Sequence, residues 1–332
     1  MPAIDPFSTL DKLGHQYPNT RVVLPESDDD RILAAAADLS AKHNMCPVLV
    51  GKPSLIHAQA DAQDLDLSGC ELLDPETDER LPELARLYCT ERPKSSAKAA
   101  LRLMRKPLFF GSMIVKAGYA DTLIAGVAYP SARVIEAGHL CIGLAKGIRT
   151  PSSFFLMLVP KTNHQPQRVL LFADCAVNVD PDPQSLADIA VASAASWKRI
   201  FNLEPRVAML SFSTLGSAKH VQVERVREAV NRLQIAHPAL AVEGEIQADA
   251  ALIPAVAEKK INELGPVAGQ ANVLVFPDLA AANIGYKLVQ HLAGARAIGP
   301  ILQGFARPLS DLSRGATSAE IVMTAQVLST QL

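Results

Sequence analysis

The segment Arg21-Val22-Val23-Leu24-Pro25 is a short apolar run of the kind that forms a buried strand, and polar residues follow it directly. Ser27 and Asp28 are residues that commonly cap the start of a helix. Beyond them, apolar residues recur at the spacing of one helix face, at Ile32, Leu33, Ala36 and Leu39. A strand, a tight turn and a helix in this order predict an α/β protein with a parallel sheet.

The same order recurs along the rest of the chain. Apolar runs predict further strands at 46–50, 121–128, 206–212, 240–246, 273–276 and 297–302. Helical spacing predicts helices near 185–201 and 223–236. One pair differs, because the runs 154–159 and 168–172 are joined by a segment too short for a crossover helix. These two runs are therefore predicted to form an antiparallel hairpin.

The chain has 332 residues, too many for one core of about 100 to 150 residues, so two domains or one large α/β unit are expected. Hydrophobic residues make up 49% and aromatic residues only 5% of the sequence. The core must then be built mainly from aliphatic side chains and alanine, as in parallel-sheet proteins. The glycine, proline and serines of 146–153 mark the best candidate hinge between two domains.

Composition argues against several classes of protein. With 32 basic and 34 acidic residues, a net charge of −2 and no basic stripe, nucleic acid is not an expected partner. The start of the sequence lacks the pattern of a secretion signal and no apolar run has the length of a membrane span, so a cytoplasmic location is expected. The five cysteines lack zinc-like spacing, and we interpret all five as buried small hydrophobic residues. No metal site is expected.

Standard nucleotide and metal signatures are also missing, including Gly-x-Gly-x-x-Gly, the P-loop pattern and His-Glu-x-x-His. Attention therefore falls on loops after predicted strands, where open α/β sheets place their ligand sites. The segment 307–315 lies between the strand ending at Leu302 and a helix predicted to begin near Thr317. Arg314 in this segment is suited to grip an anion, with help from the helix N-terminus. The alternative is a surface arginine in a turn.

Two further positions have both a chemical and a structural interpretation. Glu320 lies three residues after Thr317, which is the spacing of a helix capping box, but its carboxylate is also a candidate general base for a thiol. Lys287 and Asn283 follow a predicted strand and are candidates to neutralise and position phosphate. In the alternative interpretation, Lys287 faces water while a buried helix stripe is formed by Ile284, Leu288 and Leu292.

Several long segments in one order then carry a family resemblance. They are Phe172-Ala173-Asp174-Cys175-Ala176-Val177-Asn178, Pro205-Arg206-Val207-Ala208-Met209-Leu210-Ser211, Gln247-Ala248-Asp249-Ala250-Ala251-Leu252, Ala271-Asn272-Val273, Phe276-Pro277-Asp278-Leu279, Asn283-Ile284-Gly285-Tyr286-Lys287-Leu288-Val289-Gln290 and Asp311-Leu312-Ser313-Arg314-Gly315. Leu24-Pro25-Glu26 with Arg31-Ile32-Leu33, and Phe110-Gly111-Ser112-Met113, fit less tightly. In these segments the chain resembles the phosphotransacetylase family of phosphate acetyltransferases and butyryltransferases. It is most similar to the short phosphate acetyltransferases, including the type associated with ethanolamine use.

The resemblance implies two three-layer α/β domains with mainly parallel sheets, similar to isocitrate and isopropylmalate dehydrogenases, and an active-site cleft between them. Residues 1–148 with 301–332 are expected to form the first domain, and 149–300 the second. A homodimer is implied. The expected substrates are acetyl phosphate, phosphate and coenzyme A or acetyl-CoA, with no bound cofactor and no metal.

The resemblance also implies roles for individual residues. Ser313 stabilises the transition state, Arg314 binds phosphate, and Glu320, where many members have aspartate, deprotonates the coenzyme A thiol. We expect the acyl phosphate and coenzyme A to be bound by Arg314, Ser131, Arg133, Asn283, Tyr286 and Lys287. Arg133 is included because Glu136 stands where the family typically has a substrate-binding arginine, and Arg133 lies on the same helical face.

The expected activity is reversible acetyl transfer between acetyl phosphate and coenzyme A by thiolate attack in a ternary complex. One alternative is a related transferase that prefers propionyl or butyryl groups, for which the altered segment 129–136 would reshape the pocket. A second is an acyl-CoA sensor in which Glu136 marks lost catalysis. A nicotinamide-dependent dehydrogenase is a further alternative on grounds of fold, and the sequence argues against it.

Overall fold

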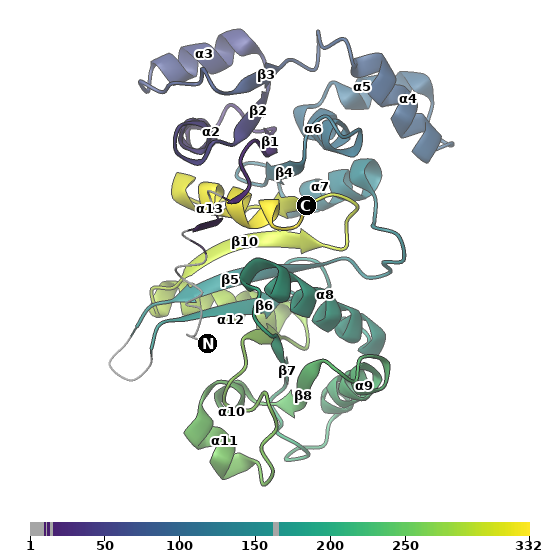
Figure 1. The fold of residues 1–332 in the computed structure, drawn as a ribbon. Helices are drawn as coiled ribbons and strands as arrows, with labels where there is room; N and C mark the ends of the chain where they lie inside the picture. The colour runs from purple at the N-terminus through teal and green to yellow at the C-terminus, as the bar shows by residue number, and fades with distance from the viewer. Residues whose placement is uncertain (1–9, 11, 14–15, 162–165) are drawn as a thin grey trace. The chain divides into compact units, whose positions relative to one another are not determined.

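The computed structural model describes residues 10, 12, 13, 16–161 and 166–332, and the chain divides into two compact units (Figure 1). The first unit consists of Leu10–Ile148 and Phe305–Leu332, and the second unit contains Arg149–Gly304. The predicted return to the first domain, at residue 301, falls inside strand β10 (Arg296–Gln303). This strand stays whole in the second unit, so the chain returns only after Gly304.

The first unit has a parallel sheet with the strand order β3-β2-β1-β4-β11. Its strands are β1 (Arg21–Leu24), β2 (Cys46–Val50), β3 (Glu71–Leu73), β4 (Thr122–Ala125) and β11 (Leu309–Asp311). Strands β1, β2 and β4 confirm sequence predictions. The sequence did not predict β3 or β11, and β11 lies inside the segment interpreted as a loop. Both have only three residues, too few to show a period.

Helices cover both faces of this sheet. They are α2 (Asp30–His43), α3 (Pro53–Asp61), α4 (Leu81–Glu91), α5 (Ala97–Met104), α6 (Pro107–Lys116), α7 (Ser131–Ala137), the π-helix η1 (Gly138–Ile142) and α13 (Ser318–Ser329). Helices α2 and α13 pack against each other over β2 and β4, whereas α6 packs on β1, β2 and β4 from the opposite side (Figure 1). The C-terminal helix is therefore part of the first unit.

The second unit has a mixed sheet with the strand order β10-β5-β6-β9-β7-β8. Its other strands are β5 (Ser152–Val159), β6 (Arg168–Ala173), β7 (Arg206–Leu210), β8 (Ala241–Ile246) and β9 (Val273–Val275). Strands β5 and β6 form the predicted antiparallel hairpin, and β5 also pairs antiparallel with β10. The remaining neighbours are parallel. In the segment that joins the hairpin, 162–165 lie outside the described residues.

The helices of the second unit are α8 (Pro183–Phe201), α9 (Val221–Ala236), α10 (Ala248–Leu252), α11 (Pro254–Lys260) and α12 (Leu279–Leu292). Helix α8 packs on β5, β6, β7 and β9, and α12 packs on β5, β6 and β10 (Figure 1). The mainly parallel α/β fold that the sequence predicts is confirmed.

Helix α12 buries a different face from the one that the sequence alternative assigned to it. Its buried residues are Ala282 and Tyr286. The expected stripe is exposed instead, by 59% at Ile284, 52% at Leu288 and 81% at Leu292.

The cysteines divide into two groups. Cys141 and Cys175 are buried as predicted, whereas Cys46, Cys70 and Cys89 are only partly buried, so the prediction was wrong for these three. Burial raises the pKa of Cys141 to about 12 and that of Cys70 to about 11, which keeps both as unreactive thiols at neutral pH. In the described part of the chain, no helix has the length and apolar character needed to cross a membrane.

Candidate active site

The turn between β1 and α2 is built from acidic residues that bind backbone groups. Helix α2 is capped by Asp29, whose carboxylate accepts a hydrogen bond from the Arg31 amide at 2.9 Å. The predicted caps, Ser27 and Asp28, lie two residues and one residue too early, respectively. The Ser27 hydroxyl instead donates to the Leu24 carbonyl at 2.9 Å and so closes the turn at the end of β1.

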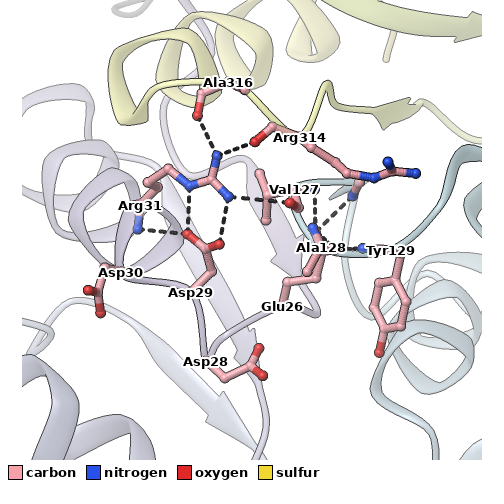
Figure 2. A network of polar contacts seen from close by, with 12 residues as sticks. Glu26, Asp28, Asp29, Asp30, Arg31, Val127, Ala128, Tyr129, Arg314 and Ala316 are labelled. Atoms are coloured by element: carbon pink, nitrogen blue, oxygen red, sulfur yellow. Dashed lines mark hydrogen bonds and ion pairs between the residues drawn. The ribbon is translucent and has the colours of Figure 1, made fainter.

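Glu26 in this turn is 2% exposed and binds the loop that follows β4. Its Oε2 accepts hydrogen bonds from the amides of Gly126 and Val127 at 2.8 and 3.0 Å. Its Oε1 accepts from Ala128 and Tyr129 at 2.8 and 2.6 Å (Figure 2). Four amides converging on one carboxylate form an anion-binding nest that the protein fills with its own side chain. This loop ends β4 at Ala125, three residues earlier than the sequence predicted.

Gly126 brings this loop against the segment that follows β11. Its φ is +116°, and a Cβ at this position would lie 2.6 Å from the backbone nitrogen and oxygen of Leu312. The Leu312 amide donates to the Ala125 carbonyl at 2.6 Å. A glycine is therefore required where these two segments meet.

The segment Ser313–Ala316 forms a tight turn between β11 and α13. The Ala316 amide donates to the Ser313 carbonyl at 2.9 Å, and the Gly315 amide donates to Ser313 Oγ at 3.4 Å. Ser313, Arg314 and Gly315 are exposed, whereas Ala316 is buried. The side chain of Arg314 extends from this turn away from Arg31 (Figure 2). A fixed backbone with an exposed hydroxyl and guanidinium suits the binding of an anionic substrate.

Asp311 lies directly beneath this turn and is 1% exposed. Burial raises the pKa of its carboxyl to about 6 from an ordinary value of 3.8, and the nearby Glu26 carboxylate raises it further. Hydrogen bonding by Ser131 and the charge of Arg314 oppose this rise. Among the described residues, Asp311 Oδ1 has no hydrogen-bond partner. Two predicted site residues, Ser131 and Arg314, are thus close enough to Asp311 to act on its carboxyl.

Glu320 completes a capping box at the start of α13. Its backbone amide donates to Thr317 Oγ1 at 3.3 Å, and its Oε2 accepts from the Thr317 amide at 2.8 Å and from Thr317 Oγ1 at 3.0 Å. The structure therefore confirms the prediction that Glu320 forms a helix capping box with Thr317. Its role as a general base stays a prediction.

Arg133 and Glu136 form an ion pair on α7, one helical turn apart. The guanidinium carbon of Arg133 also lies 4.7 Å from the centroid of the Phe109 ring, in a cation–π contact. Glu136 stands where the family typically has a substrate-binding arginine. Its charge is balanced by Arg133, the arginine expected to take over that role. Ser131 is the first residue of the same helix.

The other predicted site residues, Asn283, Tyr286 and Lys287, belong to α12 in the second unit. Asn283 Nδ2 donates to the Cys175 carbonyl at 3.4 Å, and exposed Lys287 places its Nζ 4.9 Å from the Tyr286 ring centroid. Tyr286 is 6% exposed and its ring packs on Phe155 at 4.3 Å between centroids. This burial leaves little of Tyr286 for a substrate to touch. The remaining predicted site residues all belong to the first unit; they are Ser131, Arg133, Ser313, Arg314 and Glu320.

Sequence reasoning assigned no role to Glu26, Asp29 or Arg31. Arg31 donates to the carbonyls of Arg314 and Ala316 at 2.6 and 3.0 Å, and so ties the start of α2 to the turn before α13. The signal available in the sequence was an acidic run directly after a buried strand. Among the described residues, no group of three or more His, Cys, Asp and Glu side chains is arranged to hold a metal ion.

Comparison with known proteins places this arrangement in a family. Residues 13–328 match the family described as "Phosphate acetyl/butaryl transferase". The chain is 43% identical over 304 residues to a phosphate acetyltransferase of Clostridium acetobutylicum, which is 91% of each chain. A phosphotransacetylase structure from Streptococcus pyogenes has a TM-score of 0.89 and 36% identity, covering 100% of this chain and 99% of that one. The EutD phosphotransacetylase from Staphylococcus aureus has a TM-score of 0.87 and 37% identity, covering 98% of both chains. The chain therefore belongs to the phosphate acetyl/butyryl transferase family.

Proposed function

We propose that this protein is a phosphate acetyltransferase, which reversibly transfers an acetyl group between acetyl phosphate and coenzyme A. The observation that carries the proposal is the turn after β11, whose backbone is hydrogen bonded while the Ser313 hydroxyl and the Arg314 guanidinium are exposed. Family membership and the relatives named phosphate acetyltransferase support the acetyl group as the transferred acyl group.

In the proposed reaction the thiol of coenzyme A loses its proton to Glu320 and its sulfur attacks the carbonyl carbon of acetyl phosphate. The bond between this carbon and the phosphate oxygen breaks, and phosphate leaves with the electron pair. Arg314 binds the phosphoryl oxygens through two parallel N–H donors and neutralises the charge that builds on the leaving group. The Ser313 hydroxyl donates to the oxygen that becomes negative in the transition state. Coenzyme A is a substrate here, and no bound cofactor is proposed.

Glu320 can serve as base and cap together. Both hydrogen bonds from Thr317 reach the same oxygen, Oε2, so Oε1 can accept a proton while the cap holds the side chain in place. A capped carboxylate is restricted in rotation, which fixes the direction in which it accepts the proton.

The remaining proposed substrate contacts come from both units. Ser131 and Arg133 on α7 are proposed to bind the acyl phosphate, and Asn283, Tyr286 and Lys287 on α12 are proposed to bind the substrates from the second unit. Tyr286 is 6% exposed, which restricts this role to the small part of the residue that reaches the surface. The exposed amine of Lys287 suits a phosphate of coenzyme A.

We also propose that the protein works as a homodimer in the cytoplasm. The exposed apolar stripe of Ile284, Leu288 and Leu292 on α12 supports the dimer, because a second copy would remove this surface from water. A molar mass near 71 kDa, about twice the 35.5 kDa of one chain, is expected from light scattering. A mass of one chain at micromolar concentration would argue against the dimer.

The direct test is formation of acetyl-CoA, followed by thioester absorbance, from acetyl phosphate and coenzyme A. Propionyl and butyryl phosphate are compared in the same assay, and faster turnover of either would identify the longer-chain transferase. Arg314→Gln is expected to lower kcat/KM for acetyl phosphate by roughly 10²-fold, whereas Arg307→Gln, an exposed arginine upstream in the same segment, is expected to change it little. Binding of acetyl-CoA without turnover by the unaltered protein would instead support the sensor.

A further inference from the structure

Arg31 is the second residue of α2, and its guanidinium lies where three segments of the first unit meet (Figure 2). Its Nε and Nη2 donate to the two carboxylate oxygens of Asp29 at 2.9 and 2.7 Å. Its Nη1 donates to the carbonyls of Arg314 and Ala316 at 2.6 and 3.0 Å. A second bond from Nη2 reaches the Val127 carbonyl at 3.3 Å.

These contacts use the full donor capacity of the side chain. A guanidinium has five N–H groups, one on Nε and two on each terminal nitrogen. The five acceptors described above match this number and distribution. The positive charge is balanced by Asp29 in a bidentate pair. Arg31 therefore has neither a spare donor nor an unbalanced charge for a substrate anion.

The acceptors show what the side chain does. The Arg314 and Ala316 carbonyls belong to the exposed turn that carries the two proposed catalytic side chains, and Ala316 directly precedes the cap of α13. The Val127 carbonyl belongs to the loop whose amides bind Glu26. One planar group thus fixes the distance between the α2 N-terminus, the loop after β4 and the turn after β11.

We propose that Arg31 is a positioning residue for acyl transfer, which holds the turn Ser313–Ala316 so that Ser313 and Arg314 meet the substrates, and which binds no substrate itself. This proposal rests on the proposed function. It predicts that shape matters more than charge at this position. Lysine offers three donors from a single nitrogen and cannot reach acceptors spread around a plane, so it should replace Arg31 poorly.

A matched control exists in the same unit. Arg80 makes the same local arrangement with Asp78, in which the Asp78 carboxylate accepts from the Arg80 amide at 2.9 Å, from Nε at 2.9 Å and from Nη2 at 2.7 Å. Arg80 packs near Tyr119 and Glu71 instead of the turn after β11. Arg80→Ala therefore removes an equivalent ion pair without touching Ser313 or Arg314.

The experiment compares Arg31→Ala, Arg31→Lys and Arg80→Ala in steady-state kinetics and in hydrogen exchange of the peptide covering 312–317. Both Arg31 variants should lower kcat by roughly 10²-fold, as expected for a displacement of about 1 Å, raise KM for acetyl phosphate because Arg314 is displaced, and leave KM for coenzyme A within about threefold. They should also speed exchange of the Gly315 and Ala316 amides. Millimolar guanidinium ion should restore part of the activity of Arg31→Ala, and sodium chloride should not. Arg80→Ala should match the unaltered enzyme in each measurement.

Three results would overturn the proposal. The first is unchanged exchange of 312–317 in both Arg31 variants. The second is a raised KM for coenzyme A alone that disappears with a coenzyme lacking its 3′-phosphate, because Arg31 would then contact the substrate directly. Hydrogen exchange needs no substrate. If the unaltered protein formed no acetyl-CoA, the proposed function would be refuted, and the exchange measurements would still test whether Arg31 holds the turn. Normal kcat in Arg31→Lys would show that charge suffices and would also contradict the proposal.

Discussion

The change Glu26→Gln tests whether the buried carboxylate holds the loop after β4. Glutamine has nearly the same shape, but one carboxylate oxygen becomes an NH2 group that can only donate. In the structure each Glu26 oxygen accepts from two amides, at 2.6 to 3.0 Å. Whichever way the glutamine amide turns, two backbone N–H groups lose their acceptor and face another donor.

The expected loss of stability follows from the two backbone hydrogen bonds that lose their acceptor. A hydrogen bond to a charged group contributes about 1.5–3 kcal/mol, so the loss in free energy of unfolding is roughly 3–6 kcal/mol. This is a large share of the about 5–15 kcal/mol that stabilises a typical domain. Glu243 in the second unit provides the comparison, because it accepts from only two amides, Val267 at 3.0 Å and Ala268 at 2.9 Å, with one on each oxygen. Glu243→Gln loses one acceptor and should cost about half as much.

The assay is urea unfolding followed by circular dichroism, with the free energy of unfolding extrapolated to water for both variants and the unaltered protein. The same preparations are assayed for acetyl-CoA formation, in which Glu26→Gln should lose activity because Gly126 and Leu312 pack together under the Ser313 turn. A cost below about 1 kcal/mol for Glu26→Gln, or a cost no larger than that of Glu243→Gln, would show that the four amides do not depend on the carboxylate.

Three further predictions separate the roles of single groups in the first unit. Because the folded-state pKa of Asp311 is about 6 against 3.8 unfolded, the unaltered protein should lose stability as pH rises from about 4 through 6, by about 3 kcal/mol in total. Asp311→Asn should lack this loss, which denaturation at pH 4.5 and pH 8 measures; equal pH dependence in both proteins would contradict it. Glutamine can keep a capping box, so Glu320→Gln should keep stability within about 0.5 kcal/mol and lower kcat by roughly 10²-fold or more, whereas Thr317→Ala should cost about 1 kcal/mol with a smaller loss of rate. The reverse pattern would make Glu320 a cap alone. Arg133→Ala should raise KM for acetyl phosphate by roughly tenfold, because it removes a proposed substrate contact and leaves Glu136 unpaired, and adding Glu136→Ala should restore the share that the unpaired carboxylate causes; additive effects in this double-mutant cycle would show that the pair is irrelevant to substrate.

The sequence predicted most of the strands because aliphatic runs of five or six residues carry a clear signal. It missed β3 and β11, whose three residues are set by pairing with β2 and β4 instead of by their own pattern. The structural alternative for α12 also assigned the wrong face to the core. Three large apolar residues at Ile284, Leu288 and Leu292 have the spacing of a core stripe, and a face that buries Ala282 and Tyr286 cannot compete with it on hydrophobicity alone. Which face of a helix is buried depends on the sheet beneath it.

The residues proposed to contact substrate could be identified from the sequence, whereas the side chains that bind the backbone could not. Ser313 and Arg314 were identified by their motif, and Glu320 by its spacing from Thr317. Glu26 binds backbone amides, and Arg31 binds backbone carbonyls in addition to Asp29; every residue has these backbone groups, so the sequence does not mark which ones are bound. These backbone partners are also far away along the chain, about 100 residues for Glu26 and 283 for Arg31 and Arg314. Only the folded chain shows these contacts.

Glu136 departs from the family pattern, which has an arginine at this position. The ion pair with Arg133 changes how this difference is interpreted. An isolated carboxylate on α7 would repel a phosphate, and that repulsion was the reason to consider lost catalysis. In the structure the two charges cancel, and the Arg133 guanidinium is further held by the Phe109 ring. Helix α7 therefore presents Ser131 beside a neutral pair, which removes the electrostatic argument for the sensor. Under the proposed function, recognition of the anion then depends more heavily on Arg314, and the backbone of its turn is held by contacts from two other segments of the first unit.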